Sequence, residues 1–423
     1  MSQRLWRFQM EKTINSSRGE KSPEMADIFC KYGKGYIESH PMPLEHYKIM
    51  NAIVVCRTAF LGGHIEVCDS CGKTQNSYNS CRNRHCPKCQ ALTKAKWLEA
   101  RQTELLPVPY FHNVFTLPHD LNLIILCNKK IMLDILFKAV TATLKEFAQN
   151  PKSRYKEGGK IGFTSILHTW DQKLGDHFHL HCVIPAGYLS NDGDRWIHSK
   201  KKFLFPVKAL SKVFRGKFME LMEEAFQHND LIFPGEIADI GTNAGFRKLK
   251  KQLFTKEWVV YSKQPFGGPK QVLSYLSRYT HRVAISNNRI LDIENNTITF
   301  SYRDRKNDNE KKSISIKANE FIRRFLLHAL PKKFMRIRHS GFLANRCKKE
   351  NLLKCRKILG QDNISDNLSN KSVKELMLEL TGQDISTCPF CKKGKLIKML
   401  KIPKQTGPGF FERLNLTTMK DTL

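Results

Sequence analysis

The chain has 423 residues, which suggests two to four domains of ordinary size, and 41% of them are hydrophobic, enough for a folded core. Lysine and arginine number 71 against 39 acidic residues, so the net charge is +32, a balance that favours nucleic-acid binding. No run reaches the roughly 18 apolar residues of a membrane span, and the N-terminus lacks the apolar stretch of a secretory signal, so we expect a cytoplasmic, DNA-associated protein.

The N-terminal part of the chain predicts a small helical extension followed by a cysteine-rich module. Residues 1–50 are polar and mixed, with one short predicted helix, Glu24–Tyr32, ended by Gly33. Residues 51–104 contain six of the 13 cysteines and end in a helix-forming stretch at 91–104. We expect these two segments to be an N-terminal helical extension and a zinc-binding domain.

Residues 105–345 alternate short β-type runs with helical patterns and predict one mixed body. The predicted strands are Tyr110–Leu117, Ile161–Trp170, His177–Pro185, Glu257–Tyr261 and Thr297–Tyr302. The predicted helices are Lys130–Gln149, Lys208–Gln227, Pro269–His281 and Asn319–Leu327. Residues 346–423 form a basic C-terminal segment, in which 361–387 has the composition of a linker or weak helix. The tail after Cys391 is expected to be mobile.

Two Cys-x-x-Cys pairs in the cysteine-rich module indicate a structural zinc site. Each such turn presents two thiolates to one ion, and zinc prefers four tetrahedral ligands. The simplest ligand set is Cys68, Cys71, Cys86 and Cys89, whose two pairs are separated by 14 residues. Cys81 with His85 could replace one pair or start a second site, since the module holds more donors than one ion needs. The basic residues Arg82, Arg84 and Lys88 surround the pairs and are candidate phosphate contacts.

A row of histidines marks the catalytic body. His177, His179 and His181 alternate with apolar residues in a predicted strand, so the three imidazoles point to one face. Neutral imidazoles side by side are good ligands for a divalent metal, which would explain the row.

A pair of tyrosines is the candidate nucleophile. Tyr275 and Tyr279 are spaced i, i+4 in the predicted helix Pro269–His281 and share one of its faces. Tyr279 also falls near the centre of an apolar stripe, so a role in the core is an equally good reading of that residue from periodicity alone. A tyrosine hydroxyl with its ordinary pKa of about 10 needs help to attack phosphorus, and a metal would supply it by neutralising charge.

These blocks, in this order, resemble the two-tyrosine HUH transposases of bacterial rolling-circle insertion sequences, where HUH denotes His–hydrophobe–His. Residues 78–90 are similar to the family's zinc-binding domain, residues 167–170 and 177–181 to its HUH strand, and residues 275–285 to its tyrosine helix. A weaker similarity lies at residues 336–346. The resemblance covers roughly residues 50–395.

The resemblance implies an α+β fold, with an HUH endonuclease core formed by an antiparallel sheet flanked by helices. The core would be the catalytic domain of residues 105–345, beside a zinc-ribbon-like module and a small C-terminal cysteine-containing segment. It implies Mg²⁺ or Mn²⁺ at the histidines, a 5′-phosphotyrosine intermediate and transfer of single-stranded DNA between element ends and a target.

Roles carry over where residues match. His179 and His181 fit the HUH pair, with His177 as the third ligand by strand geometry, and His168 or Gln172 as alternatives. Tyr275 and Tyr279 fit the nucleophile pair, and Arg278, His281 and Arg282 are candidate phosphate contacts.

Some alternatives stay open from the sequence. Cys347, Cys355, Cys388 and Cys391 could form a second zinc site, although Cys347 and Cys355 have the spacing of ordinary core residues. For the whole chain, the alternatives to a transposase are an HUH replication initiator and a non-catalytic zinc-ribbon DNA-binding protein. The second of these predicts neither aligned histidines nor paired tyrosines.

Overall fold

The computed structural model describes residues 22–102, 104–149, 158–199, 204–266, 272, 283–304, 307–361, 372–382 and 384–406. Apart from Val272, the predicted helix Pro269–His281 lies outside the described residues. The candidates outside them are Tyr275, Arg278, Tyr279, His281 and Arg282. No helix in the described ranges is both long and apolar enough to cross a membrane.

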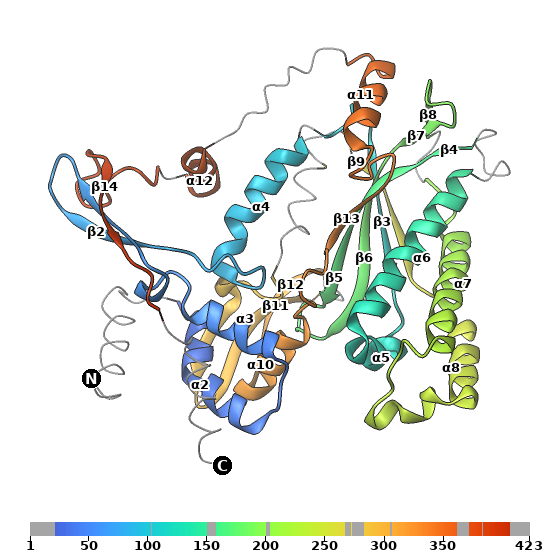
Figure 1. Ribbon diagram of the computed structural model, residues 1–423, viewed down its shortest axis with the longest axis horizontal. Coiled ribbons are helices and arrows are strands. Elements are labelled where there is room, and N and C mark those ends of the chain that lie inside the picture. The colour runs from blue at the N-terminus through green and yellow to red at the C-terminus, as the bar shows by residue number, and fades with distance from the viewer. Residues whose placement is uncertain are drawn as a thin grey trace.

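A five-stranded antiparallel sheet forms the centre of the molecule, in the order β13-β5-β6-β3-β9 (Figure 1). Its strands are β3 (Tyr110–Thr116), β5 (Gly162–Trp170), β6 (Asp176–Pro185), β9 (Val260–Phe266) and β13 (Ile337–Gly341). Four of the five predicted strands correspond to β3, β5, β6 and β9 of this sheet, and the fifth corresponds to β11 (Thr297–Asp304) in another sheet. The antiparallel sheet flanked by helices confirms the predicted fold class.

One face of this sheet packs against long helices to form the main core. Alternate residues such as Phe163 on β5 and Leu180 on β6 point into it, since side chains alternate along a strand. The covering helices are α5 (Asn122–Cys127), α6 (Lys129–Gln149), α7 (Val207–Gln227) and α8 (Asn243–Thr255). Figure 1 shows α6 and α7 side by side along this face. A small sheet of β4 (Gly159–Lys160), β7 (Gly187–Ser190) and β8 (Trp196–His198) lies at its end.

The N-terminal helices share a core with a segment more than 200 residues later. The elements of this second core are α2 (Met25–Ser39), α3 (Leu44–Val54), β10 (Ile290–Glu294), β11 (Thr297–Asp304), β12 (Glu310–Lys317) and α10 (Ala318–Leu327). Helix α2 passes through Gly33 instead of ending there, because Tyr36 and Ile37 beyond it are buried in this core. That burial outweighs the cost of about 1 kcal/mol for a glycine inside a helix.

The cysteine-rich module is a hairpin and a helix. Strands β1 (Gly63–Cys68) and β2 (Thr74–Tyr78) form the hairpin, and α4 (Pro87–Gln102) follows it. The predicted mobile tail is wrong in part, because β14 (Leu396–Ile402) pairs with β1 and completes a three-stranded sheet. The remaining C-terminal helices are α11 (Lys348–Ile358) and α12 (Val373–Thr381).

Candidate functional site

Three buried histidines meet on the face of the central sheet opposite α6 and α7. His179 and His181 lie on β6, and His168 lies on β5 directly opposite His179. One ring nitrogen from each lies within 4.8 Å of the others, and all three side chains are buried. The HUH pair of the sequence analysis is therefore part of a cluster of possible metal donors.

The third member of this cluster is His168, whereas the sequence analysis placed His177 there. His177 shares the strand face and its ring lies 4.7 Å from that of His179, but it falls outside the group of converging nitrogens. The physical reason is spacing. His177 is four residues from His181, about 13 Å along the strand, whereas His168 lies opposite His179 on the neighbouring strand, where Cβ atoms are about 5 Å apart. Gln172, the other alternative, lies in the turn after β5.

The hydrogen bonds of the pair determine where its protons lie. His179 Nδ1 donates to the carbonyl of His177 at 2.8 Å, so Nε2 of neutral His179 carries a lone pair. That Nε2 lies 3.1 Å from Nε2 of His181. Two lone pairs at this distance repel each other, so the gap holds either a proton of His181 or a cation.

His112 on β3 is a member of the site that the sequence analysis missed. Its Nε2 lies 2.9 Å from Nδ1 of His181, and the two rings stack. Burial, reinforced by the charge of Lys263, lowers the pKa of His112 to about 3, so the ring is neutral at neutral pH. A polar residue inside the apolar predicted strand Tyr110–Leu117 was the only signal for it.

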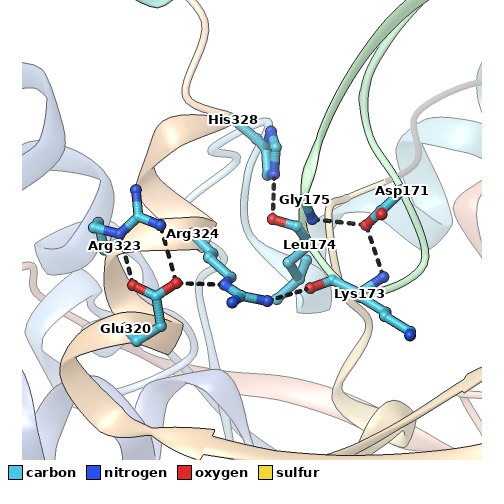
Figure 2. Close-up of polar contacts among 8 residues, drawn as sticks. All are labelled: Asp171, Lys173, Leu174, Gly175, Glu320, Arg323, Arg324 and His328. Atoms are coloured by element: carbon cyan, nitrogen blue, oxygen red, sulfur yellow. Dashed lines mark hydrogen bonds and ion pairs between the residues drawn. The ribbon is translucent and has the colours of Figure 1, made fainter. Parts of the chain in front are cut away.

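Helix α10 holds the β5–β6 turn beside this site, as Figure 2 shows. His328 bonds through Nε2 to the Leu174 carbonyl at 3.2 Å, and Arg324 donates to the Lys173 carbonyl at 3.2 Å. Glu320 in turn accepts from Arg324 at 2.6 Å, which fixes the guanidinium. The turn is therefore braced from outside the sheet.

The same turn carries its own internal support and contacts the histidines. Asp171 accepts backbone hydrogen bonds from Lys173 and Gly175, the pattern of an Asx turn. Trp170, just before it, stacks on His168 with ring centroids 5.2 Å apart. The contacts between α10 and the turn are thus connected, through Trp170, to His168, the third donor of the cluster.

Val272 is the described residue nearest in sequence to the tyrosine pair, and it belongs to an apolar cluster that includes residues of the histidine face. It is fully buried in a cluster with Ile166 of β5 and Val183 of β6. Ile166 pairs with His181 across the strands, and Val183 follows His181 by two residues on β6. Val272 precedes Tyr275 by three residues.

The cysteines divide into two groups of four, which corrects the predicted set of Cys68, Cys71, Cys86 and Cys89. Cys86 and Cys89 at the start of α4 join Cys56 and Cys81. The Sγ atoms of Cys56 and Cys81 each lie 3.6 Å from that of Cys89. Cys68 and Cys71 belong to the other group, with Cys388 and Cys391.

The β1–β2 hairpin explains this division. Cys56 and Cys81 flank its base, where Arg57 N donates to Asn79 O at 3.1 Å. Cys68 and Cys71 lie at its tip, and five or six strand residues separate base and tip by about 16–20 Å. One ion cannot bind at both places. His85, the expected alternate ligand, is in neither group, and neither are Cys347 and Cys355.

The candidate phosphate contacts beside the cysteines differ in their surroundings. Arg84 donates to the carbonyls of Phe334 and Pro331, both at 2.6 Å, and so ties the turn before α4 to the chain after α10. Lys88 forms an ion pair with Glu24 at 2.6 Å. Arg82 is exposed. Of these three residues, Arg82 is therefore the one whose side chain is placed for an external partner.

Two family comparisons match this organisation. Residues 28–117 match a family described as "Transposase zinc-binding domain", and residues 162–351 match one described as "Putative transposase". The first range contains six of the eight clustered cysteines, and the second contains the three histidines.

Two relatives are similar over most of the chain. "Putative transposase y4qJ" of Sinorhizobium fredii is 45% identical over 389 residues, which cover 91% of this chain and 97% of that protein. The "Transposase for insertion sequence element IS801" of Pseudomonas savastanoi pv. phaseolicola is 28% identical over 300 residues, which cover 70% of this chain and 69% of that protein.

Proposed function

The chain belongs to the IS91 family of insertion-sequence transposases, and we propose that it cuts and rejoins single-stranded DNA through a tyrosine nucleophile beside a histidine-bound divalent ion. The observation that carries this proposal is the convergence of His168, His179 and His181 on one sheet face. Three buried imidazoles that each bring a ring nitrogen within 4.8 Å of the others form a possible ligand set for one divalent ion.

The donor set fits a divalent ion such as Mg²⁺ or Mn²⁺. An octahedral ion with ligands at about 2.1 Å holds neighbouring ligand atoms about 3.0 Å apart. The Nε2 atoms of His179 and His181 are separated by 3.1 Å. Such an ion would neutralise negative charge on the scissile phosphate. His181 would then donate its Nδ1 proton to His112, and His179 already donates to a carbonyl, so both lone pairs would face the ion.

We propose Tyr275 and Tyr279 as the nucleophiles, with support from Val272. Val272, three residues before Tyr275, shares a buried apolar cluster with Ile166 and Val183 of the histidine face, which supports a position of the tyrosines near that face. In the reaction, the tyrosine hydroxyl gives up its proton as its oxygen bonds to phosphorus, the phosphorus–O3′ bond breaks, and the leaving 3′-oxygen takes up a proton, so no net proton is gained or lost. The DNA stays linked by a 5′-phosphotyrosine ester, so rejoining needs no ATP.

The substrate in this proposal is single-stranded DNA of the element ends, followed by target DNA. The net charge of +32 supports a polyanionic partner. Arg278, His281 and Arg282 next to the tyrosines, with Arg82 on the zinc module, are the proposed phosphate contacts. Binding is expected to weaken steeply as salt is raised.

The test is a covalent adduct. Purified protein is mixed with 5′- or 3′-labelled single-stranded DNA of the element ends and Mn²⁺, then denatured and separated by gel electrophoresis. An adduct that retains only the label 3′ to the cut is expected. Tyr275→Phe and Tyr279→Phe should each alter it and the double variant abolish it.

Matched histidine variants test the metal site. The single variants His168→Ala, His179→Ala and His181→Ala should each abolish the adduct. His177→Ala should retain most of it. Salt-sensitive binding without any adduct, from metal-loaded protein and verified ends, would overturn the catalytic proposal. An adduct that survives His168→Ala but not His177→Ala would return the third ligand to His177.

A further inference from the structure

The second cysteine group joins parts of the chain that are far apart in sequence. Cys71 Sγ lies 3.8 Å from Cys388 Sγ, although 317 positions separate the two residues, and Cys68 Sγ lies 3.6 Å from Cys391 Sγ. We propose that these four thiolates bind a second tetrahedral, thiophilic ion such as Zn²⁺, which fastens the C-terminal segment to the β1–β2 hairpin. Cys388 and Cys391 lie outside both family ranges, so neither range assigns this site.

The sulfur–sulfur distances fit a shared ion. Zinc–sulfur bonds are about 2.3 Å long, and the edge of a regular tetrahedron with that radius is about 3.8 Å. The separations of 3.6 and 3.8 Å are close to this edge. They are far longer than the roughly 2.05 Å of a disulfide. All four cysteines are free thiols in the structure.

Each cysteine pair sits in a tight turn of the same kind. Cys68 N donates to Lys73 O at 2.9 Å, and Cys388 N donates to Gly394 O at 2.8 Å. A backbone N–H also points at the first or second sulfur of each turn, from Cys71 to Cys68 Sγ at 3.5 Å and from Gly394 to Cys391 Sγ at 3.4 Å. Such bonds stabilise thiolates, the form that binds metal.

The residue after each second cysteine has a left-handed backbone. Gly72 has φ 67° and Lys392 has φ 58°. Glycine adopts this conformation without strain, but a lysine does so only at a cost of order 1 kcal/mol or more. A strained lysine at the equivalent position of the second turn indicates that the turn geometry itself is required there.

The two turns interlock at Gly394. A Cβ atom added to Gly394 would lie 2.4 Å from Cys68 Sγ and 2.6 Å from Asp69 Oδ1, so only glycine fits. Asp69 Oδ1 also accepts from Lys395 N at 2.8 Å, while Asp69 N donates to Lys395 O at 3.1 Å. The C-terminal turn is therefore shaped to the hairpin tip.

Little apolar burial holds β14 on β1, which gives the ion a structural purpose. Ile397, Met399 and Leu400 of β14 are each more than half exposed. The strand pairing from Gly63↔Ile402 to Cys68↔Leu396 and the hydrogen bonds between Asp69 and Lys395 also join the two segments. A short strand with exposed side chains is only marginally stable in water, so an ion at its end would supply most of the attachment.

The first experiment counts zinc per chain in the full-length protein. Wild type is expected to hold two equivalents. Cys388→Ser with Cys391→Ser should hold one, and so should Cys68→Ser with Cys71→Ser. The quadruple variant should also hold one, since both pairs would serve the same ion. Cys127→Ser, an exposed cysteine outside both groups, is the matched control and should keep two.

The proposal is overturned if the Cys388 and Cys391 double variant keeps the zinc content of wild type. That result is expected if Cys68 and Cys71 share an ion with Cys86 and Cys89 instead. It is also overturned if the quadruple variant loses one equivalent more than either double variant, because the two pairs would then serve different ions.

A measurement on wild type covers the case in which the variants fail to fold. Thiol alkylation is followed by mass spectrometry with and without a chelator. Cys68, Cys71, Cys388 and Cys391 should be protected together and become reactive together when zinc is removed. Labelling of Cys388 and Cys391 at the rate of Cys127 in the zinc-loaded protein would overturn the proposal.

Discussion

Nε2 of His112 lies 2.9 Å from Nδ1 of His181, and this contact joins two strands of the central sheet at the centre of the histidine face. With its pKa lowered to about 3 by burial, His112 stays neutral and acts on His181 through a hydrogen bond. A partner of this kind selects the tautomer of a metal-binding imidazole and holds its orientation.

Replacement of His112 should weaken the proposed ion site without removing it. His112→Leu is expected to raise the Mn²⁺ concentration for half-maximal adduct formation by about 10- to 100-fold, the usual cost of losing a hydrogen-bond partner of a ligand. The measurement is adduct yield as a function of Mn²⁺, and high Mn²⁺ should restore the yield. His228→Ala, on the exposed end of α7, should match wild type. Loss of adduct at every Mn²⁺ concentration would instead give His112 a direct role.

Local patterns in the sequence predict which strands carry the site better than they predict which residues belong to it. The alternation of His179 and His181 with apolar residues correctly indicates a strand with one polar face. Which residue lies opposite His179 depends on the register of β5 against β6, and that register involves a bulge between His168 and Trp170. No spacing within β6 encodes it, so the sequence favours His177 over His168 as the third ligand.

The cysteines show the same limit over a longer range. A Cys-x-x-Cys turn can be recognised from four residues, but its partner is chosen by the fold. The β1–β2 hairpin separates Cys68 from Cys86, and the pairing of β14 with β1 brings in Cys391. Strand β14 has five apolar residues among seven, a strand-like run within the basic tail, but most of its side chains are exposed, so its place in a sheet depends on the pairing with β1.

The first cysteine group can be tested by variants that separate the two possible groupings. Cys56→Ser and Cys81→Ser should each lose one zinc equivalent and lower the free energy of unfolding, because a structural zinc contributes directly to folding. His85→Ala should keep the full zinc content, since His85 lies in neither group. Zinc content and urea denaturation measure both effects. Zinc loss in His85→Ala with retention in Cys56→Ser would contradict the grouping.

Arg84 and Arg82 should differ in the property that each supports. Arg84→Ala removes a guanidinium from the carbonyls of Leu330, Pro331 and Phe334, so unfolding should become easier by on the order of 3 kcal/mol. Arg82→Ala should leave stability unchanged and lower the salt dependence of single-strand binding, with a change of about 0.7 in the log–log slope. Denaturation and binding titrations in salt measure the two. If Arg84→Ala instead changed the salt dependence of binding and Arg82→Ala lowered stability, Arg84 would be the residue that contacts DNA.

The buried His328 should make the protein less stable in mild acid. Burial lowers its pKa to about 4, against an ordinary value of 6.5, while its bond to the Leu174 carbonyl keeps the ring beside the turn (Figure 2). Between pH 6.5 and 4 the unfolded chain therefore binds a proton at this residue that the folded chain does not. Its stabilising contribution is complete above pH 6.5 and is lost as the pH falls towards 4, by about 3 kcal/mol in all.

The measurement compares urea denaturation of wild type and His328→Gln at several pH values in excess zinc. Glutamine can still donate to the Leu174 carbonyl but does not titrate, so the variant should lose stability less steeply below pH 6.5. The expected difference in slope reaches about 1.4 kcal/mol per pH unit. Acidic groups and zinc ligands titrate in both proteins and cancel in the comparison. Parallel curves for the two proteins would mean that His328 takes up its proton without unfolding.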